Sequence, residues 1–301
     1  MARERRRLWI DPVRLRAAAA TAPATLQPAA AEAHYLQRVL RCRPGDRLDL
    51  VDGAGRLLPA VLEAGGALRL ELEQEPPPQP PARLPITLAL ALPRRDGELV
   101  WRMATELGVD RLQPLLAERG QVRGEAPLER WRAIVREALE QCERLWLPQL
   151  EEPQPALAWL QQHRDRAALL ATTRREGLPP LEHLLPAAAM APGATAALEE
   201  GVGAGGDPLP PVGPASLAGV TLAVGPEGGW SPAEETAALE AGWRPVSLGP
   251  TILRTGTAAV AGVARLVSWR TLSCAASNPP SRGNPPDRLP PGDDAADPPR
   301  G

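Results

Sequence analysis

The sequence lacks several residue types that a chain of 301 residues usually contains. It has no Phe and one Tyr, so eight Trp supply nearly all of its aromatic side chains. Hydrophobic residues still make up 44% of the chain, which means that Leu, Val, Ala and Trp must build the cores. It has no Lys either, and all 34 basic residues are Arg, which stays charged when buried and can bind phosphate bidentately.

Cysteine is also scarce, and long apolar runs are missing. Cys42, Cys142 and Cys274 are widely spaced, and an odd number without a CxxC pair argues against a disulfide framework or a zinc site. No apolar run is long enough to span a membrane, and the basic N-terminus lacks the apolar core of a signal peptide. We therefore expect a cytoplasmic protein with no metal and no membrane partner.

The net charge of -2 is not the strongly basic balance typical of a nucleic-acid-binding domain. The charge is uneven, however, because six Arg stand against Glu4 and Asp11 in the first sixteen residues. This local excess could contact phosphates, or it could be a solvated terminus. Charge alone leaves both interpretations open.

The N-terminal part of the chain predicts a small β-rich unit. Turn residues at 43–46 and at Asp52-Gly53 separate short segments in which Leu alternates with polar residues. Such alternation is typical of a barrel-like module with one wet face. A run of prolines follows, and we place a stiff linker there. The predicted domains are residues 1–78 and 84–273, joined by a linker at 79–83.

The second unit alternates buried strands with helices, which predicts an α/β domain with a mainly parallel sheet. The expected strands are residues 86–92, 111–116, 167–173, 220–224 and 246–248, and the expected helices are 98–108, 128–147 and 257–270. In the first helix Leu99, Met103 and Leu107 form one apolar stripe. In the second, Glu140 and Arg144 form an i,i+4 pair on the outer face. Residues 190–215 predict a flexible insertion and residues 274–301 a disordered tail.

One glycine-rich segment carries the clearest functional signal. The buried strand 220–224 leads directly into Gly225-Pro226-Glu227-Gly228-Gly229-Trp230-Ser231. Ser231, Pro232 and Glu234 then form an N-cap, a first helical position and a capping box. The loop therefore lies at the carboxyl end of a strand, where open α/β sheets bind ligands. It is neither GxGxxG nor a Walker loop, and by itself it could be a mere tight turn.

A second segment runs from Leu248 to Ala259 and reads LGPTILRTGTAA. Its Gly and Pro predict a loop, Arg254 offers a fixed positive charge, and a helix of small residues begins behind it. Such a helix permits the close approach of another backbone. The plainer interpretation is a loop with a surface Arg and a tightly packed helix.

Together the two segments resemble the SPOUT superfamily, the methyltransferases with a knotted C-terminal region. More narrowly, the chain resembles the bacterial 16S rRNA uridine-N3 methyltransferase family. Further matches are Thr105 to Val109 (TELGV), the helical pattern from Glu137 to Pro148, and the segment from His34 to Gly53. The resemblance covers residues 5–272, and one departure is Gly256, where the family usually has Glu.

The resemblance implies a knotted α/β methyltransferase domain preceded by a PUA-like β-barrel RNA-binding domain. It implies S-adenosylmethionine as the cofactor, held by loops near residues 170–173, 224–229 and 248–258. The expected cofactor-binding residues are Leu170, Thr172, Gly225, Pro226, Glu227, Gly228, Gly229, Leu248, Gly249, Ile252, Leu253, Thr257 and Ala258. It implies a homodimer, for which the small residues Ala258, Ala259, Ala261 and Gly262 are suited.

The implied reaction is methylation of N3 of a uridine in 16S rRNA of the small ribosomal subunit. Arg254 is the candidate to stabilise the developing uracil anion, and Glu227 is either a proton acceptor or, as we favour, a residue that fixes the loop. Arg7, Arg38, Arg41 and Arg43 are the candidates for RNA binding. Two alternatives stay open: a related RNA methyltransferase with another target nucleotide, and a ribosome-assembly factor that has lost catalysis because of Gly256.

Overall fold

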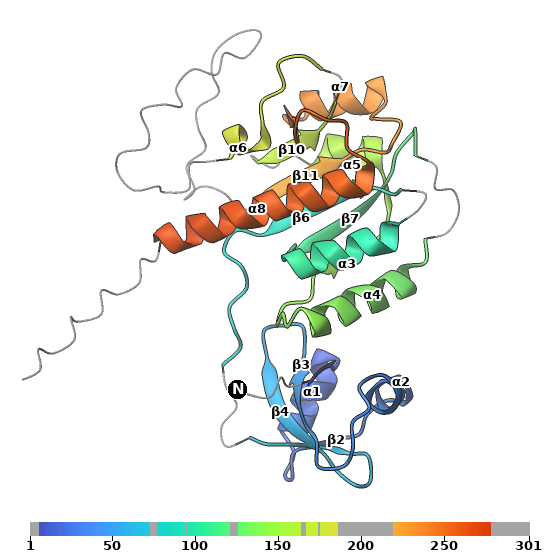
Figure 1. Cartoon of the computed structure of the whole chain (residues 1–301), viewed down its shortest axis with the longest axis vertical. Helices are drawn as coiled ribbons and strands as arrows, with labels where there is room; N and C mark the ends of the chain where they lie inside the picture. The colour runs from blue at the N-terminus through green and yellow to red at the C-terminus, as the bar shows by residue number, and fades with distance from the viewer. Residues whose placement is uncertain are drawn as a thin grey trace, which may run out of the picture.

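The structure is a computed structural model that describes residues 6–72, 77–93, 96–120, 126–163, 167–173, 175–185 and 219–277. The described chain forms an N-terminal unit and a larger α/β unit, which lie at opposite ends of the molecule in Figure 1. The predicted insertion at 190–215 and most of the predicted tail lie outside the described residues.

The N-terminal unit is a five-stranded sheet in the order β1-β3-β4-β5-β2 with its own hydrophobic core. Strands β1 and β3 pair in parallel, and the Asp52-Gly53 turn lies in the β3–β4 hairpin as expected. A π-helical turn, η1, follows α2 directly. The elements are β1 Arg6–Trp9, α1 Pro12–Ala19, β2 Thr25–Leu26, α2 Ala30–His34, η1 Tyr35–Val39, β3 Arg47–Val51, β4 Leu57–Leu62 and β5 Leu68–Leu70.

The α/β unit is a seven-stranded parallel sheet in the order β12-β10-β11-β6-β7-β8, with β9 also paired to β7. Its strands are β6 Ile86–Ala91, β7 Arg111–Leu116, β8 Gln149–Leu150, β9 Gln154–Pro155, β10 Ala168–Ala171, β11 Val220–Val224 and β12 Arg244–Val246. Its helices are α3 Gly97–Leu107, α4 Leu128–Gln141, α5 Ala156–Gln162, α6 Leu181–Leu184, α7 Pro232–Glu240 and α8 Thr255–Ser277. The predicted α/β class with a mainly parallel sheet is confirmed.

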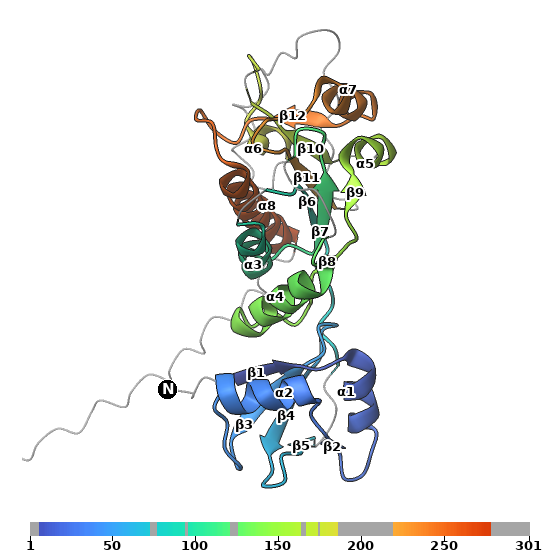
Figure 2. The ribbon, with the colours of Figure 1, turned by 90° about the vertical axis from the view of Figure 1, so that its right-hand side faces the viewer.

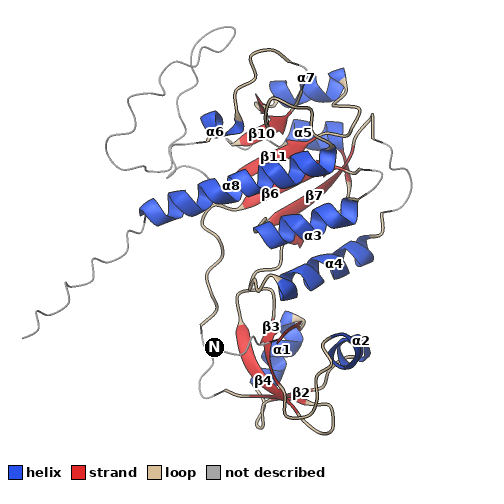
Figure 3. Cartoon of the chain, viewed as in Figure 1, coloured by secondary structure: helices blue, strands red, loops and turns tan. Residues whose placement is uncertain are grey.

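Helices cover both faces of this sheet. Figures 2 and 3 show α3, α4 and α8 on one side and α5 and α7 on the other. Each side has its own core, because alternate residues of β6 point in opposite directions: Leu88 and Leu90 pack toward α3 and α8, whereas Ala89 and Ala91 pack toward α5 and α7. The central strands are therefore apolar on both faces, as their sequences indicate.

Helix α8 packs very closely on the sheet. A Cβ placed on Gly262 would lie 2.3 Å from Leu222 Cδ2 of β11, so any larger residue would force the Leu222 side chain to move. Ala259 is fully buried, and Ala258 is nearly so. The small residues of α8 are thus explained by packing within one chain, and they do not by themselves indicate a dimer. The helix also extends further in both directions than the sequence suggested, from Thr255 to Ser277.

Two details of the predicted helices are wrong. The buried face of α3 is formed by Val100, Trp101 and Ala104, whereas Leu99 is exposed, so the expected apolar stripe is rotated by one residue. Helix α4 ends at Gln141 and not near Leu147, because Glu143 adopts a left-handed conformation with φ 60°. The six residues after α4 instead form the contact with the N-terminal unit.

This contact joins the two units through main-chain and side-chain bonds. Leu147 N donates to Gly53 O at 2.9 Å, and Gly55 N donates to Leu145 O at 2.9 Å. Glu140 accepts a hydrogen bond from Trp9 N at 2.6 Å, so it is not free to pair with Arg144 as expected. Burial is the main cause that raises the pKa of Glu140.

Candidate functional site

The TELGV segment and Arg144 lie together at the amino end of the sheet. Arg144 Nη1 donates to the carbonyls of Thr105 at 2.8 Å and Val109 at 2.7 Å, and its Nη2 lies 3.5 Å from Asp110 Oδ1. Arg270 of α8 binds Asp110 Oδ2 and donates to Gly108 O at 2.8 Å. These residues tie α3, α4 and α8 to the start of β7, so this motif is structural.

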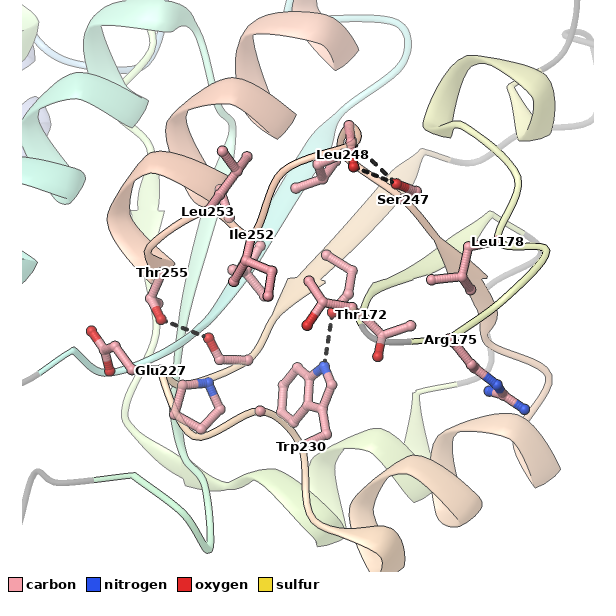
Figure 4. Close-up of a pocket in the computed structure, with 18 of the residues that line it drawn as sticks. Thr172, Arg175, Leu178, Glu227, Trp230, Ser247, Leu248, Ile252, Leu253 and Thr255 are labelled. Carbon is pink, nitrogen blue, oxygen red and sulfur yellow. Dashed lines mark hydrogen bonds between the residues drawn. The ribbon is translucent and has the colours of Figure 1, made fainter.

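A pocket of about 530 Å³ lies at the opposite, carboxyl end of the sheet. Three loops line it: the loop after β10, the glycine loop 225–230 after β11, and the loop 247–254 after β12. Figure 4 shows Thr172, Trp230, Leu248 and Ile252 arranged around this space. The chain after β12 thus returns across the ends of β10 and β11 before α8 begins, which is the path expected of the knotted fold.

A different physical reason explains why glycine occupies each of three positions in the glycine loop. A Cβ on Gly225 would lie 3.0 Å from Cε2 of the Trp230 ring, so this glycine leaves room for the indole. A Cβ on Gly228 would lie 3.2 Å from Cβ of Arg119, which approaches from the loop after β7. Gly229 has φ 73°, a left-handed conformation in which glycine carries no penalty.

Hydrogen bonds join the three loops to one another. The Trp230 indole Nε1 donates to Ala171 O at 3.0 Å, which connects the glycine loop to the loop after β10. The Thr255 hydroxyl, at the start of α8, donates to Gly225 O at 3.0 Å. Thr172 N donates to Val246 O at 3.2 Å. Both side-chain bonds are drawn in Figure 4. The pocket walls are therefore fixed relative to one another.

The predicted capping box is present and is extended by a third partner. Ser231 caps α7 by accepting from Glu234 N, and Glu234 Oε2 accepts from Ser231 N at 2.9 Å. The other carboxylate oxygen, Oε1, accepts from Glu118 N at 2.8 Å. Glu234 is buried, so all of its carboxylate is used to hold the end of the glycine loop against the segment after β7.

Among the described residues, four charged side chains line the pocket: Arg119, Arg175, Glu227 and Glu235. Arg175 Nη1 lies 3.2 Å from Glu235 Oε1 of α7. Arg119 binds two carbonyls of the glycine loop. Glu227 is exposed and makes no hydrogen bond within the described chain, whereas the buried Glu234 fixes the loop through hydrogen bonds. The charge–dipole role that we favour for Glu227 stays a prediction.

The structure brings most of the predicted cofactor residues to the pocket. Those that line it are Thr172, Gly225, Pro226, Glu227, Gly228, Gly229, Leu248, Gly249, Ile252, Leu253 and Ala258. Leu170 does not line it, because it is fully buried in the core beneath the sheet. Thr257 and Arg254 are exposed and lie outside the lining.

Sequence reasoning missed the lining residues that lie outside the two motifs and the three expected loops. They are Arg119, Arg175, Gly177, Leu178, Glu235 and Ser247. Most of them follow β7, β10 or β12 directly. The rule that ligands bind beyond the carboxyl ends of parallel strands could have found them.

Gly256, the departure from the family pattern, does not line the pocket. A Cβ at this position would lie 3.2 Å from Val100 Cγ2 of α3. A side chain here would therefore start toward α3.

The predicted RNA-binding arginines divide into two kinds. Arg7 lies at the contact between the units, where its Nη2 pairs with Glu143 Oε2 at 3.0 Å. Arg38, Arg41 and Arg43 are exposed on and after η1, and none of them forms an ion pair within the part of the chain that the structure describes. Only the second group has its charge available to a partner.

Within the described ranges, no group of His, Cys, Asp and Glu side chains could hold a metal ion. The three cysteines are unpaired. Among the described helices, none combines the length and apolar character needed to cross a membrane.

Comparison with known proteins agrees with the two units of the fold. A family profile for an RNA methyltransferase domain matches residues 80–267, and a profile for an RNA methyltransferase PUA domain matches residues 29–75. The chain is 38% identical, over 250 residues, to the ribosomal RNA small subunit methyltransferase E of Synechocystis, covering 81% of this chain and 73% of the relative. It is 33% identical over 236 residues to the protein of that name from Mycobacterium tuberculosis, covering 76% and 80%.

Solved structures show the same similarity. The ribosomal RNA small subunit methyltransferase E of Neisseria gonorrhoeae bound to S-adenosyl methionine superimposes with a TM-score of 0.67 at 26% identity, covering 88% of this chain and 98% of that one. Fold and pocket thus define an α/β RNA methyltransferase with an N-terminal PUA-like domain. The chain belongs to the ribosomal RNA small subunit methyltransferase E family.

Proposed function

We propose that this chain transfers a methyl group from S-adenosylmethionine to N3 of a specific uridine in 16S rRNA of the small ribosomal subunit. One observation carries the proposal: three loops at the ends of β10, β11 and β12 are tied together around a single pocket in a member of this family. The Neisseria gonorrhoeae relative, whose structure contains S-adenosyl methionine, supports the choice of cofactor.

The pocket suits a nucleoside-sized ligand. Its volume of about 530 Å³ lies within the range typical of small-molecule sites. At Gly229 and Gly249 a Cβ would meet nothing within 4 Å, so the main chain borders open space where a ligand can approach it. S-adenosylmethionine supplies an electrophilic methyl group when bound. The chain must then bind it, orient it and manage the proton of the acceptor.

Glu227 is our candidate for the proton acceptor. Uridine N3 is a poor nucleophile until it loses its proton, and a base near the acceptor speeds that step. Glu227 lies on the pocket lining, is exposed, and has no hydrogen-bond donor of its own within the described residues. Its carboxylate is therefore free to accept a proton, unlike that of the buried Glu234.

Arg254 remains the candidate to stabilise the anion on the uracil oxygens. It stands between Leu253 and Thr255, which both line the pocket, while its own side chain is exposed outside the lining. This place at the rim suits a contact with the RNA that enters, and it does not suit a contact with the cofactor.

Arg38, Arg41 and Arg43 would bind the RNA backbone from the PUA-like domain. Exposed arginines without an ion-pair partner can neutralise phosphates, which releases the counterions condensed on the RNA. Arg7 is assigned to the contact between the units instead. The proposed dimer of two such chains remains a prediction that size measurement in solution would test.

The decisive experiment is methylation of isolated small ribosomal subunits, followed by mass spectrometry of the rRNA nucleosides. We expect a single 3-methyluridine to appear with the wild-type protein and to be missing from a deletion strain. Retention of 3-methyluridine in that strain would contradict the proposed target and favour another nucleotide. Failure to bind S-adenosylmethionine in calorimetry would favour an assembly factor without catalysis.

A further inference from the structure

We propose that Arg119 is a positioning residue that holds the glycine loop in its cofactor-binding conformation. This inference rests on the proposed function, because it assigns a role within the same pocket. Arg119 lies in the segment after β7, more than 100 residues before the loop that it contacts. None of the motifs that point to the pocket includes it.

The contacts of Arg119 lie on both sides of Gly229, the left-handed residue of the loop. Its Nη1 donates to Gly228 O at 3.3 Å and to Trp230 O at 3.1 Å. Gly229, between these two residues, has φ 73° and donates from its N to Pro226 O at 2.8 Å. One guanidinium nitrogen therefore fixes the carbonyls that flank the left-handed residue.

The neighbouring contacts show that Arg119 belongs to a clamp on this loop. Glu118 N donates to Glu234 Oε1, which holds the first turn of α7 just beyond the loop. A Cβ on Gly228 would lie only 3.2 Å from Arg119 Cβ, so the two backbones are in close contact. The segment after β7 thus holds the loop in place before any ligand binds.

This arrangement favours binding of the cofactor, because a loop that is already ordered loses less conformational entropy when the cofactor binds. Without Arg119 the two carbonyls can turn to solvent, and the loop samples conformations that do not fit the ligand. Hydrogen bonds from a charged donor are stronger than those between neutral groups. Loss of the two hydrogen bonds from Arg119 should weaken binding of S-adenosylmethionine by about tenfold.

The test compares Arg119→Ala and Arg119→Lys with Arg111→Ala in the full chain. Arg111 stands at the other end of the same strand, where it is exposed and lies 3.6 Å from Glu151 Oε1. Calorimetry with S-adenosylmethionine gives Kd, methylation of small subunits gives KM and kcat, and thermal unfolding of the ligand-free protein gives Tm.

We expect Arg119→Ala to raise Kd and KM for S-adenosylmethionine about tenfold, while kcat at saturating cofactor stays within about threefold. Its ligand-free Tm should stay within about 2 °C of wild type, because the side chain is exposed. Arg119→Lys should recover part of the affinity, because its ammonium group can reach one carbonyl. Arg111→Ala should bind S-adenosylmethionine with the same Kd as the wild-type protein.

One result would overturn the inference while leaving the proposed function intact, namely an unchanged Kd of Arg119→Ala for S-adenosylmethionine. If the KM for small subunits rises at this unchanged Kd, Arg119 is an RNA contact instead. If the wild-type protein itself fails to bind S-adenosylmethionine, the proposed function fails before this inference is reached.

Discussion

The two ends of the parallel sheet use the same kinds of residue in opposite ways. At the amino end, Asp110, Arg144 and Arg270 are mostly buried and each is paired, with side chains only 14–20% exposed. At the carboxyl end, Glu227 and Arg254 are exposed and unpaired within the described chain. Charge therefore stabilises the fold at the amino end, whereas at the carboxyl end at least these two charged residues stay available for chemistry.

Glycines serve both ends of the sheet. Gly108, at the amino end, has φ 112° and ends α3, and a Cβ there would also lie 3.1 Å from Arg270 Nη2. Gly225 and Gly228 at the carboxyl end make room for Trp230 and Arg119, which come from other parts of the loop or of the chain. Substitutions at the two ends should therefore separate loss of stability from loss of function.

The largest effect is expected at the amino end. Asp110→Ala leaves Arg144 and Arg270 without their counterion and removes the acceptor of Ile86 N, which donates to Asp110 Oδ2 at 2.8 Å. We expect it to lower the free energy of unfolding by about 3 kcal/mol, because it leaves buried charges uncompensated. Urea unfolding measures this, and an unchanged midpoint would show that the network is not a source of stability.

Glu227→Gln should have the largest effect on catalysis. If the carboxylate accepts the N3 proton, its amide cannot, and kcat should fall about a hundredfold. Single-turnover methylation of small subunits measures this. Because Glu227 makes no hydrogen bond within the described chain, the midpoint of urea unfolding should not change. Normal single-turnover rates in this variant would exclude Glu227 as the base.

Gly225→Ala tests the geometry of the pocket. The new methyl group would stand 3.0 Å from the Trp230 ring, which must move and so strain its hydrogen bond to Ala171 O. We expect the affinity for S-adenosylmethionine to fall roughly tenfold or more, since overpacking typically costs 1–3 kcal/mol. The control is Gly65→Ala in the β4–β5 turn, where a Cβ meets nothing within 4 Å. If calorimetry shows that Gly225→Ala binds S-adenosylmethionine as tightly as the wild type and Gly65→Ala do, this explanation of Gly225 is wrong.

The smallest effect is expected for Glu182→Gln at the third loop. Arg265 of α8 binds Glu182 and donates to Leu248 O at 3.0 Å, and its hydrogen bonds lower the pKa of the Glu182 carboxyl. A lowered folded-state pKa stabilises the protein above the unfolded pKa, and this contribution disappears as the pH falls through the folded value. Glu182 is half exposed, so we expect at most about 0.5 kcal/mol at pH 7. Urea unfolding should show a difference at pH 7 that becomes smaller as the pH falls below the unfolded pKa of the carboxyl.

Strands β6, β10 and β11 could be predicted because they are apolar on both faces, whereas β8, β9, α5 and α6 were not predicted. Val220–Val224 was predicted without error, and so was the capping box at Ser231. The errors fall where tertiary contacts override a local pattern. Periodicity continued α4 to Leu147, but Glu143 turns left-handed because the next residues pair with Gly53 and Gly55.

The candidate site shows the same limit. Its two loops after β11 and β12 could be found because each carries a motif with glycine directly after a strand. The loop after β10 contributes Arg175 and Leu178, and the loop after β7 contributes Arg119, although neither carries such a motif. Arg254 seemed to belong to the pocket because it lies inside a motif, yet its side chain is exposed outside the lining.

The sequence by itself determined the α/β class, the position of the glycine loop and the capping box that follows it. These features depend on residues within a few positions of one another, so that spacing and backbone preference are sufficient to define them. Only the tertiary structure decided that Arg119 holds the glycine loop, that Glu234 and not Glu227 is its fixed carboxylate, and that Arg7 joins the two units. Those roles depend on partners more than 100 residues away, and no local pattern records which distant segments a parallel sheet will bring together.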